Sequence, residues 1–156
     1  MQDFLKENFL SVWHHFLFFE INRSREAVIA WGSANGYLVF QVICWHYILI
    51  LTAGTDVKLR DEAVQLWYKF SKDGFETNTV LTYTLISQLT SLSIETVRRQ
   101  VKKLEKGNWV SYSKKNGVKF QPSEENNKFL ADIFNEREVK NLGHFLDIIE
   151  KRKNKV

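Results

Sequence analysis

Positively charged side chains gather in one stretch of this 156-residue chain, from Ser93 to Phe120. The stretch carries eight Lys or Arg residues and two Glu residues, a net charge of +6, whereas the whole chain has a net charge of +4. The remaining residues therefore sum to −2. A local concentration of positive charge predicts a polyanion as the partner, and a solvated helix face is the alternative interpretation.

The first half of this stretch has the periodicity of a helix that runs from Ser93 to about Lys106. Val97, Val101 and Leu104 recur at helical spacing and would face a core. The Ser93 hydroxyl is suited to cap the first turn, because it can accept a hydrogen bond from a free backbone N–H. The side chains between these apolar positions are basic: Arg98, Arg99, Lys102 and Lys103.

A short β-hairpin is predicted directly after this helix. Gly107 would end the helix in the left-handed conformation, which glycine tolerates. Residues 109–112 and 118–120 would form the strands, and Asn116-Gly117 between them suits a type I′ turn, whose φ angles are positive. A basic helix followed at once by a basic hairpin is typical of a winged helix-turn-helix.

A second short helix, predicted from Thr82 to Thr90, precedes the basic helix. Its apolar side chains would face the core, and Ser87 is small where the two helices should cross closely. Ser91-Leu92 would form the tight turn into Ser93. The two helices and the turn complete a helix-turn-helix.

The segment TYTLISQLTSLSIETVRRQVKKLEKGNWVSYSKKNGVKF, residues 82–120, resembles the helix-turn-helix of the cyclic-AMP receptor and fumarate-nitrate regulator family. The match covers about a quarter of the chain, and winged-helix regulators of other families share much of this pattern. The resemblance implies a winged helix that binds DNA. The features that match are Ser93, Glu95-Thr96-Val97, Arg99, Leu104-Glu105 and Asn108.

Two features depart from that family. Ile94 stands where the family usually has an arginine that reads a guanine, so the target sequence is expected to differ. Ile94 would instead meet a thymine methyl group or belong to the core. The family also carries a β-rich cyclic-nucleotide domain upstream, and nothing before residue 80 looks like that domain.

The candidate DNA-contacting residues have roles that follow from their chemistry. Glu95 would accept a hydrogen bond from cytosine N4, and Arg99, one turn later, would contact a guanine or hold Glu95 and a phosphate. Arg98 and Lys102 suit phosphates, and Thr96 would contact DNA or cap the helix. The candidates on the two helices are Thr82, Thr84, Ser93, Ile94, Glu95, Thr96, Arg98, Arg99 and Lys102, and those on the hairpin are Lys114, Lys115, Asn116 and Lys119.

The N-terminal third of the chain carries more apolar surface than a winged domain requires. The helix predicted at residues 3–21 should be buried between elements or between subunits. No charged residue occurs from Ala27 to Thr55, so this stretch is either a membrane span or a helix buried in a dimer core. The polar residues that interrupt it favour the buried helix. Gly32 and Gly36 have the spacing that lets two helices approach closely. Alternatively, Asn35-Gly36 is a turn between two antiparallel helices.

The rest of the chain is predicted to be helical. Residues 55–60 would be a linker, and a helix at 61–72 would pack across the other two helices of the winged domain. Pro122-Ser123 would begin another helix, Asn135-Glu136 would mark a break, and a last helix from about 138 to 151 would pack internally or against a partner copy. The predicted organisation is a helical, aromatic-rich dimerisation region at 1–55, a winged helix-turn-helix domain at 56–122 and C-terminal helices at 123–156.

The sequence offers little for catalysis or metal binding. Cys44 is the single cysteine, so an intramolecular disulfide and a Cys-based zinc site are excluded. The four histidines lack the spacing of metal ligands, and the glycines form no phosphate-binding loop. No secretory signal is evident at the N-terminus. We therefore expect a cytoplasmic protein that is not an enzyme, with no cofactor and no metal.

The sequence thus predicts a mainly α protein in which three helices and a β-hairpin wing are joined to extra N- and C-terminal helices. The predicted function is sequence-specific DNA binding by a transcriptional regulator, as a homodimer on a palindromic site in double-stranded DNA. An unidentified small-molecule effector is a further candidate partner. The alternatives are a winged-helix protein-interaction or assembly module and a membrane-tethered regulator. DNA binding predicts that the basic residues share one exposed face, whereas an assembly module predicts that this face is covered.

Overall fold

The computed structural model of the chain describes residues 1–73 and 79–154, and the side chains of 1–70 and 79–154. Over these residues the protein is mainly helical with a two-stranded antiparallel sheet, as the sequence predicts. The elements are α1 (Gln2–Glu7), α2 (Phe9–Trp31), α3 (Ala34–Gly54), α4 (Arg60–Asp73), α5 (Tyr83–Thr90), α6 (Ile94–Lys106), β1 (Val110–Ser113), β2 (Gly117–Phe120), α7 (Glu124–Lys128), the π-helix η1 (Phe129–Asn135) and α8 (Glu136–Lys153).

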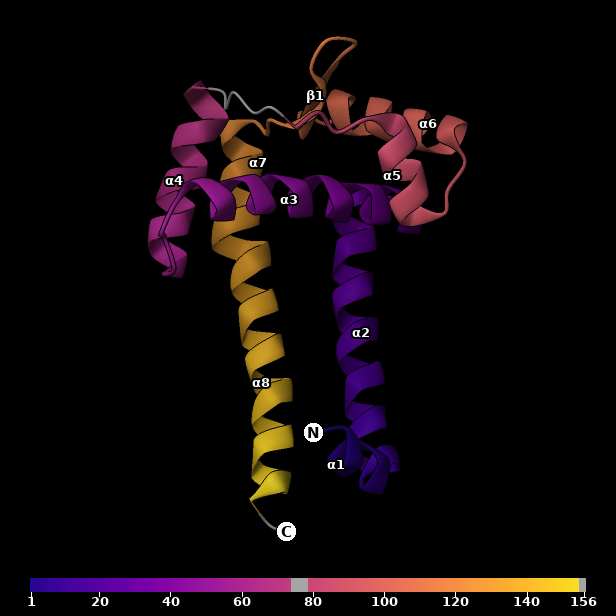
Figure 1. Cartoon of the computed structure of the whole chain (residues 1–156), viewed down its shortest axis with the longest axis vertical. Helices are drawn as coiled ribbons and strands as arrows, with labels where there is room; N and C mark the ends of the chain where they lie inside the picture. The colour runs from indigo at the N-terminus through magenta and orange to yellow at the C-terminus, as the bar shows by residue number, and fades with distance from the viewer. Residues whose placement is uncertain (74–78, 155–156) are drawn as a thin grey trace.

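Two long helices, α2 and α8, lie side by side below a group of shorter elements (Figure 1). We call α2 and α8 the stalk, and the elements from α3 to α7 the head. The two helices of the stalk are joined by an ion pair in which Arg23 Nε donates to Glu138 Oε1 at 2.7 Å. Phe19 also stacks on Phe145, with 5.7 Å between the ring centroids. Helix α1 and the C-terminal end of α8 lie at the end of the stalk that is far from the head.

The apolar stretch from Ala27 to Thr55 is divided between two helices. Gly32 ends α2 with a φ of 75°, and the Ser33 hydroxyl caps α3 by accepting from Gly36 N at 2.9 Å. The predicted division is confirmed, but its predicted place at Asn35-Gly36 is wrong, and α3 runs across α2 instead of antiparallel to it (Figure 1). Gly32 and Gly36 consequently do not belong to one helix-packing motif.

The helix at the centre of the head is α3, which packs against α5, α6 and β2. The helix at 61–72 was the expected occupant of this position, and that prediction is wrong. Instead, α4 lies to one side, where Arg60 Nη2 donates to the Ala131 carbonyl at 2.7 Å and Arg60 Nε donates to Asn135 Oδ1 at 3.1 Å. The helix that packs across α5 and α6 is α3, which is more apolar than α4. An apolar helix suits this position because its buried face contacts several elements at once.

One side of α3 is exposed. Leu38, Trp45, Ile48 and Leu49 are each more than a third exposed, although the opposite side of the helix is buried. By length and composition α3 is also apolar enough to cross a membrane, a test that a core helix of a soluble protein passes as well. The buried face of this stretch packs within the chain, and its burial in a dimer core stays a prediction.

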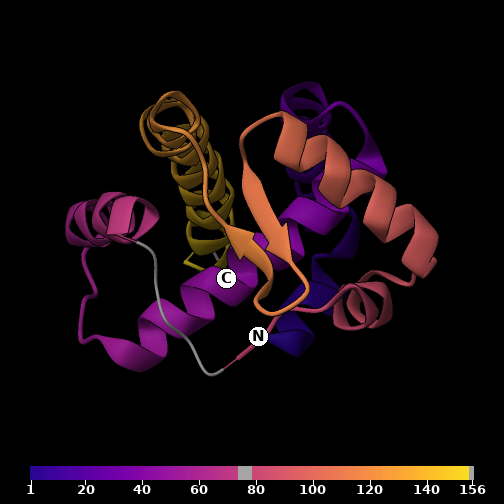
Figure 2. The same cartoon turned by 90° about the horizontal axis from the view of Figure 1, so that it is seen from above.

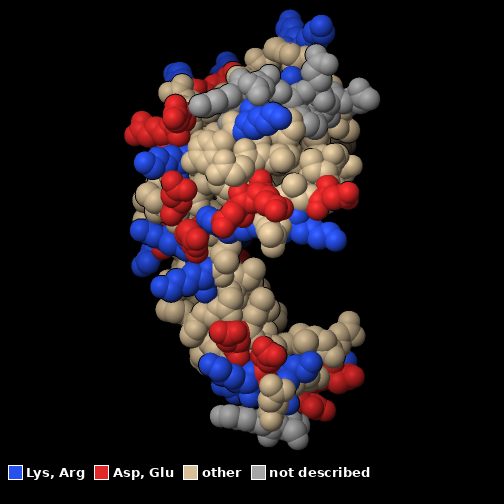
Figure 3. All heavy atoms as spheres, turned by 90° about the vertical axis from the view of Figure 1, so that its left-hand side faces the viewer, with Lys and Arg blue, Asp and Glu red and all other residues tan. Residues whose placement is uncertain are grey.

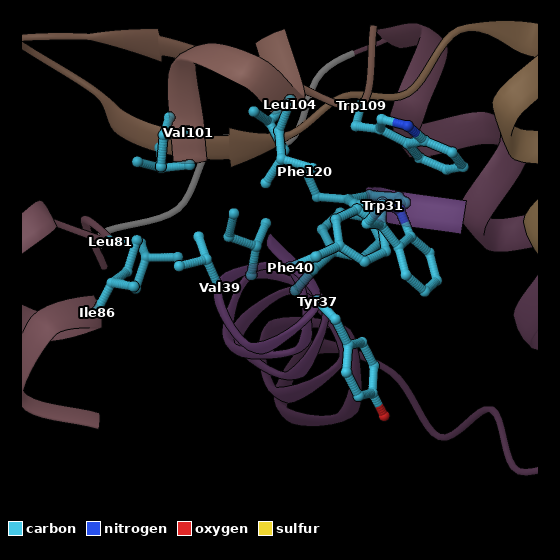
Figure 4. Packing of buried hydrophobic residues seen from close by; sticks show 14 of the residues in the cluster. Trp31, Tyr37, Val39, Phe40, Leu81, Ile86, Val101, Leu104, Trp109 and Phe120 are labelled. Atoms are coloured by element: carbon cyan, nitrogen blue, oxygen red, sulfur yellow. The ribbon is translucent and has the colours of Figure 1, made fainter. Parts of the chain in front are cut away.

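The core joins the stalk to the head through Trp31 at the end of α2 (Figure 4). Its indole stacks on Phe40, with ring centroids 4.4 Å apart, and meets Phe134 and Trp109 edge-on at 4.8 and 5.7 Å. Burial of each such side chain contributes about 1.5–3 kcal/mol. The same core cluster contains residues from both sides of the predicted domain boundary at 55 and 56.

The hairpin turn differs from the predicted type I′ turn. Ser113 pairs with Gly117, so that Lys114, Lys115 and Asn116 form a three-residue loop. Gly117 has a φ of 66°, whereas Asn116 has no positive φ, and a type I′ turn requires positive φ at both central residues. Within the hairpin, the left-handed conformation is confined to Gly117, the residue that directly follows the loop and begins β2.

Two helix ends also differ from prediction. At the end of α6, Gly107 has a φ of −81° and the left-handed residue is Asn108, with a φ of 57°. The expected break at Asn135-Glu136 is absent from the described chain, because η1 continues directly into α8. The predicted cap of α7 is confirmed, since the Ser123 hydroxyl accepts from Asn126 N at 3.2 Å.

Candidate nucleic-acid interface

Helices α5 and α6 are joined by a tight turn that side-chain hydrogen bonds hold. Ser91 takes a left-handed φ of 57°, and the Ser87 hydroxyl donates to the Leu92 carbonyl at 2.6 Å. The Thr82 hydroxyl caps α5 by accepting from Leu85 N at 3.1 Å. The predicted cap of α6 is confirmed, because the Ser93 hydroxyl accepts from Thr96 N at 3.2 Å.

Helix α6 turns one side to the core and the other to solvent. Val97, Val101 and Leu104 are buried as predicted, together with Gln100. The solvent side is a shallow groove lined by Glu95, Arg98, Arg99, Lys102, Lys103 and Lys106. This groove therefore carries five positive charges and one negative charge. Lys103 and Lys106 were not among the predicted DNA contacts, although their spacing on the helix could have identified them.

One ion pair lies within this groove. Arg98 Nη1 is 3.1 Å from Glu95 Oε2, and both side chains are exposed. The sequence predicted that Arg99 would either contact a guanine or hold Glu95 and a phosphate, and in the structure the residue that contacts Glu95 is Arg98. Within the described residues, Arg99, Lys102 and Lys106 make no ion pair. An exposed pair contributes at most about 1 kcal/mol, so Glu95 and Arg98 remain free to exchange partners.

The hairpin loop adds further positive charge beside α6. Lys114, Lys115 and Asn116 are exposed, and the Ser113 hydroxyl orders the loop by accepting from Asn116 N at 3.0 Å. The view from above shows the hairpin next to α6 (Figure 2), and Figure 1 shows both on the side of the head opposite the stalk. We call this surface the basic face: Arg98, Arg99, Lys102, Lys103 and Lys106 of α6, and Lys114 and Lys115 of the loop.

The hairpin is attached to the segment that precedes α5. Val118 N donates to the Leu81 carbonyl at 2.9 Å, and a Cβ at position 117 would collide with the same carbonyl oxygen. Tyr112 N also donates to Glu105 Oε1 at 2.9 Å, which joins β1 to α6. The position of the loop relative to α6 is consequently fixed by the fold.

A tyrosine pair forms a second link between the hairpin and α5. The rings of Tyr83 and Tyr112 stack with 4.5 Å between their centroids. Burial raises the pKa of Tyr83 to about 12, and the neighbouring Tyr112 and Glu105 also raise it. The sequence gave no role to either tyrosine, because the contact between their rings depends on where the hairpin packs relative to α5.

Most of the predicted contact residues are exposed. Thr96 and Lys119 are half-buried. Ile94 is 44% exposed, so its alternative assignment to the core is wrong. The exposed residues are Thr82, Thr84, Ser93, Ile94, Glu95, Arg98, Arg99, Lys102, Lys114, Lys115 and Asn116.

Within residues 1–73 and 79–154, no group of three or more His, Cys, Asp or Glu side chains is placed to hold a metal ion. Comparisons of the chain with protein-family models, with curated proteins and with solved structures find no match. The resemblance to the cyclic-AMP receptor and fumarate-nitrate regulator family stays a prediction.

Proposed function

We propose that this protein is a winged helix-turn-helix regulator of transcription that binds double-stranded DNA as a homodimer in the cytoplasm. The observation that carries the proposal is the basic face, whose cations lie on a rigidly joined helix and hairpin and are mostly unpaired. In this assignment α3, α5 and α6 are the three helices, and β1 and β2 form the wing. The winged domain proposed at residues 56–122 therefore also includes α3, which lies in the N-terminal region.

In the proposed complex, the N-terminal half of α6 enters the major groove. Glu95 accepts a hydrogen bond from a cytosine amino group, and its weak, exposed pair with Arg98 opens when the carboxylate contacts the base. Arg99 and Lys102 are exposed on the same helix and contact a guanine or the phosphates. The loop residues Lys114 and Lys115 reach the adjacent backbone or minor groove. The exposed hydroxyls of Thr82 and Thr84 face a phosphate at the start of α5.

The homodimer is supported by the stalk. On α2, exposed apolar side chains recur four residues apart at Trp13, Leu17 and Ile21, on a different side from the residues that meet α8. On α8, Val139, Leu142 and Leu146 are exposed at similar spacing. We call these six residues the apolar stripe. A soluble monomer seldom leaves such a patch uncovered, and a second copy would cover it.

The shape of the molecule suits this mode of dimerisation. In Figure 3 the stalk is hollowed between the head and its lower end, and the hollow is lined largely by residues that carry no charge. Two copies joined along their stalks, about a two-fold axis parallel to α2, would present two α6 helices on the same side. For binding to a palindromic site these helices should lie one turn of DNA apart, roughly 34 Å.

The test is selection of bound fragments from genomic DNA with the purified protein, at a stated salt concentration. Wild type should enrich a palindromic motif, and the variant Arg99→Glu/Lys102→Glu should enrich none. Lys140→Glu makes a matched control, because Lys140 is an exposed lysine on α8, away from the basic face. Failure of the wild type to enrich any fragment would favour a protein-interaction module instead.

A further inference from the structure

The exposed side of α3 continues onto α5. Leu38, Trp45 and Ile48 recur along α3 at the spacing of one helix side. Leu89 of α5 lines a shallow depression together with Leu38 and Trp45. All four side chains are large, apolar and 37–50% exposed. We call these four residues the α3 patch, which therefore spans two helices of the head.

The α3 patch is continuous with the apolar stripe of the stalk. Trp45 and Ile48 border a cavity of about 360 Å³ that lies where the stalk meets the head. Ile48 also lines a second cavity, of about 260 Å³, together with Val139, which is the first α8 residue of the apolar stripe. An apolar surface therefore runs from Leu89 across α3 and down α8.

This surface offers almost no unpaired charge to a partner. Helix α3 contains no charged residue, and the depression beside Leu89 has none in its wall. In the larger cavity, Arg23 and Glu138 pair with each other at 2.7 Å. In the smaller cavity, Arg60 pairs with Asp61 at 3.1 Å. Such a surface attracts neither a polyanion nor a strongly charged protein, so it fits another apolar surface.

The apolar stripe alone is small for a stable dimer. Its six side chains are about half exposed, and burying their exposed parts would remove roughly 300 Å² of apolar surface from water on each copy. An interface of standard size takes about 800 Å² from each partner. A homodimer joined along its stalks therefore needs more surface, and the α3 patch is the apolar surface that adjoins the stripe.

We propose that the α3 patch belongs to the homodimer interface, where it packs against the same continuous apolar surface of a second copy. A two-fold dimer uses one surface twice, so the head of each copy contacts the other copy. Because α5 and α6 pack together, this contact also fixes the positions of the two α6 helices relative to each other. The contact depends on the proposed homodimer, and it adds the head to an interface otherwise confined to the stalk.

Charge substitutions in the α3 patch test this contact. Trp45→Glu and Leu89→Glu should each raise the dissociation constant of the homodimer at least about 10-fold, because a carboxylate would enter an apolar interface. Leu59→Glu is the matched control and should leave the constant unchanged, since Leu59 is 65% exposed and lies outside both the patch and the stripe. Analytical ultracentrifugation of the full-length variants measures the constants, and circular dichroism checks that each variant is folded.

Hydroxyl-radical footprinting of the wild type is a second measurement, and it requires no variant to fold. At protein concentrations above the dissociation constant, Trp45 and Leu89 should be oxidised several-fold more slowly than at concentrations below it, because the second copy covers them. Leu59 should be oxidised at the same rate in both conditions.

The outcomes separate the α3 patch from the homodimer itself. If the wild type is a dimer, two results would overturn the proposal and leave the proposed function standing. They are unchanged dissociation constants for both folded variants, or equal oxidation of Trp45 and Leu89 above and below the dissociation constant. A wild type that is monomeric at micromolar concentration would overturn the homodimer and the patch contact together. A monomer that floats with phosphatidylcholine vesicles would assign the patch to a membrane instead.

Discussion

The basic face of the head and the apolar stripe of the stalk are both exposed, yet they differ in what holds them and in what would cover them. The basic face is fixed by hydrogen bonds, such as those from Val118 N to Leu81 and from Tyr112 N to Glu105. The stripe lies on two helices that pack through Phe16, Phe19 and Phe145 on another side. Charge that is left without partners favours a polyanion, whereas apolar surface that is left uncovered favours a second protein surface.

The largest expected effect contrasts a glycine of the head with one of the stalk. Gly117→Ala should destabilise the protein by about 3 kcal/mol, because the residue has a left-handed φ and a Cβ would collide with the Leu81 carbonyl. Gly143→Ala in α8 should stabilise it by about 0.5–1 kcal/mol, since a Cβ there meets no atom within 4 Å. Urea unfolding measures both. Equal changes in the free energy of unfolding at the two sites would mean that Gly117 is not packed against the Leu81 carbonyl.

The second prediction concerns the stripe. Leu17→Glu/Leu146→Glu should raise the dissociation constant of the homodimer about 100-fold, because two charges would enter an apolar contact. Leu17 and Leu146 are 48% and 53% exposed, so each chain should still fold. Ile29→Glu, at a site on another side of α2 that is 76% exposed, is the control and should leave the dimer intact. Analytical ultracentrifugation distinguishes these cases, and a wild type that is monomeric at micromolar concentration would remove the role of the stripe.

The third prediction tests specificity on the basic face. Glu95→Ala should relax the preference at one base pair per half-site, at a cost in discrimination of about 1–3 kcal/mol. Removal of the carboxylate also releases Arg98 from its 3.1 Å ion pair, so total affinity for DNA should fall less than specificity. Binding-site selections compare the motifs. An unchanged motif would show that Glu95 reads no base.

The smallest expected effect concerns a single phosphate contact. Lys115→Ala should weaken binding to all DNA sequences alike and lower the slope of log affinity against log salt by about 1, because one phosphate contact and its counterion release are lost. The matched control is Lys140→Ala, at an exposed lysine of the stalk. Fluorescence anisotropy at several salt concentrations measures both variants. A changed motif with an unchanged slope would contradict a phosphate role for Lys115.

The local features of the helix-turn-helix segment could be predicted from the sequence. The Ser93 cap, the buried positions Val97, Val101 and Leu104, and the exposure of Arg98 and Arg99 depend on periodicity and capping, which act within a few residues. The existence of a hairpin after α6 also followed from local residues. Its exact turn did not, because Asn116-Gly117 permits more than one loop length and the carbonyl of Leu81 takes part in the choice.

The tertiary structure decided which apolar helix packs at the centre of the head and which distant aromatic side chains come together. The helices at 34–54 and 60–73 both offered apolar faces, and α3 packs against α5, α6 and β2 because its buried positions fit several elements together. The same packing brings Trp31 of α2 and Trp67 of α4 to one cavity. Sequence patterns indicate that a side chain is apolar or can donate a hydrogen bond. Which distant residues it contacts depends on how the faces of whole helices and strands pack together, and that packing exists only in the folded molecule.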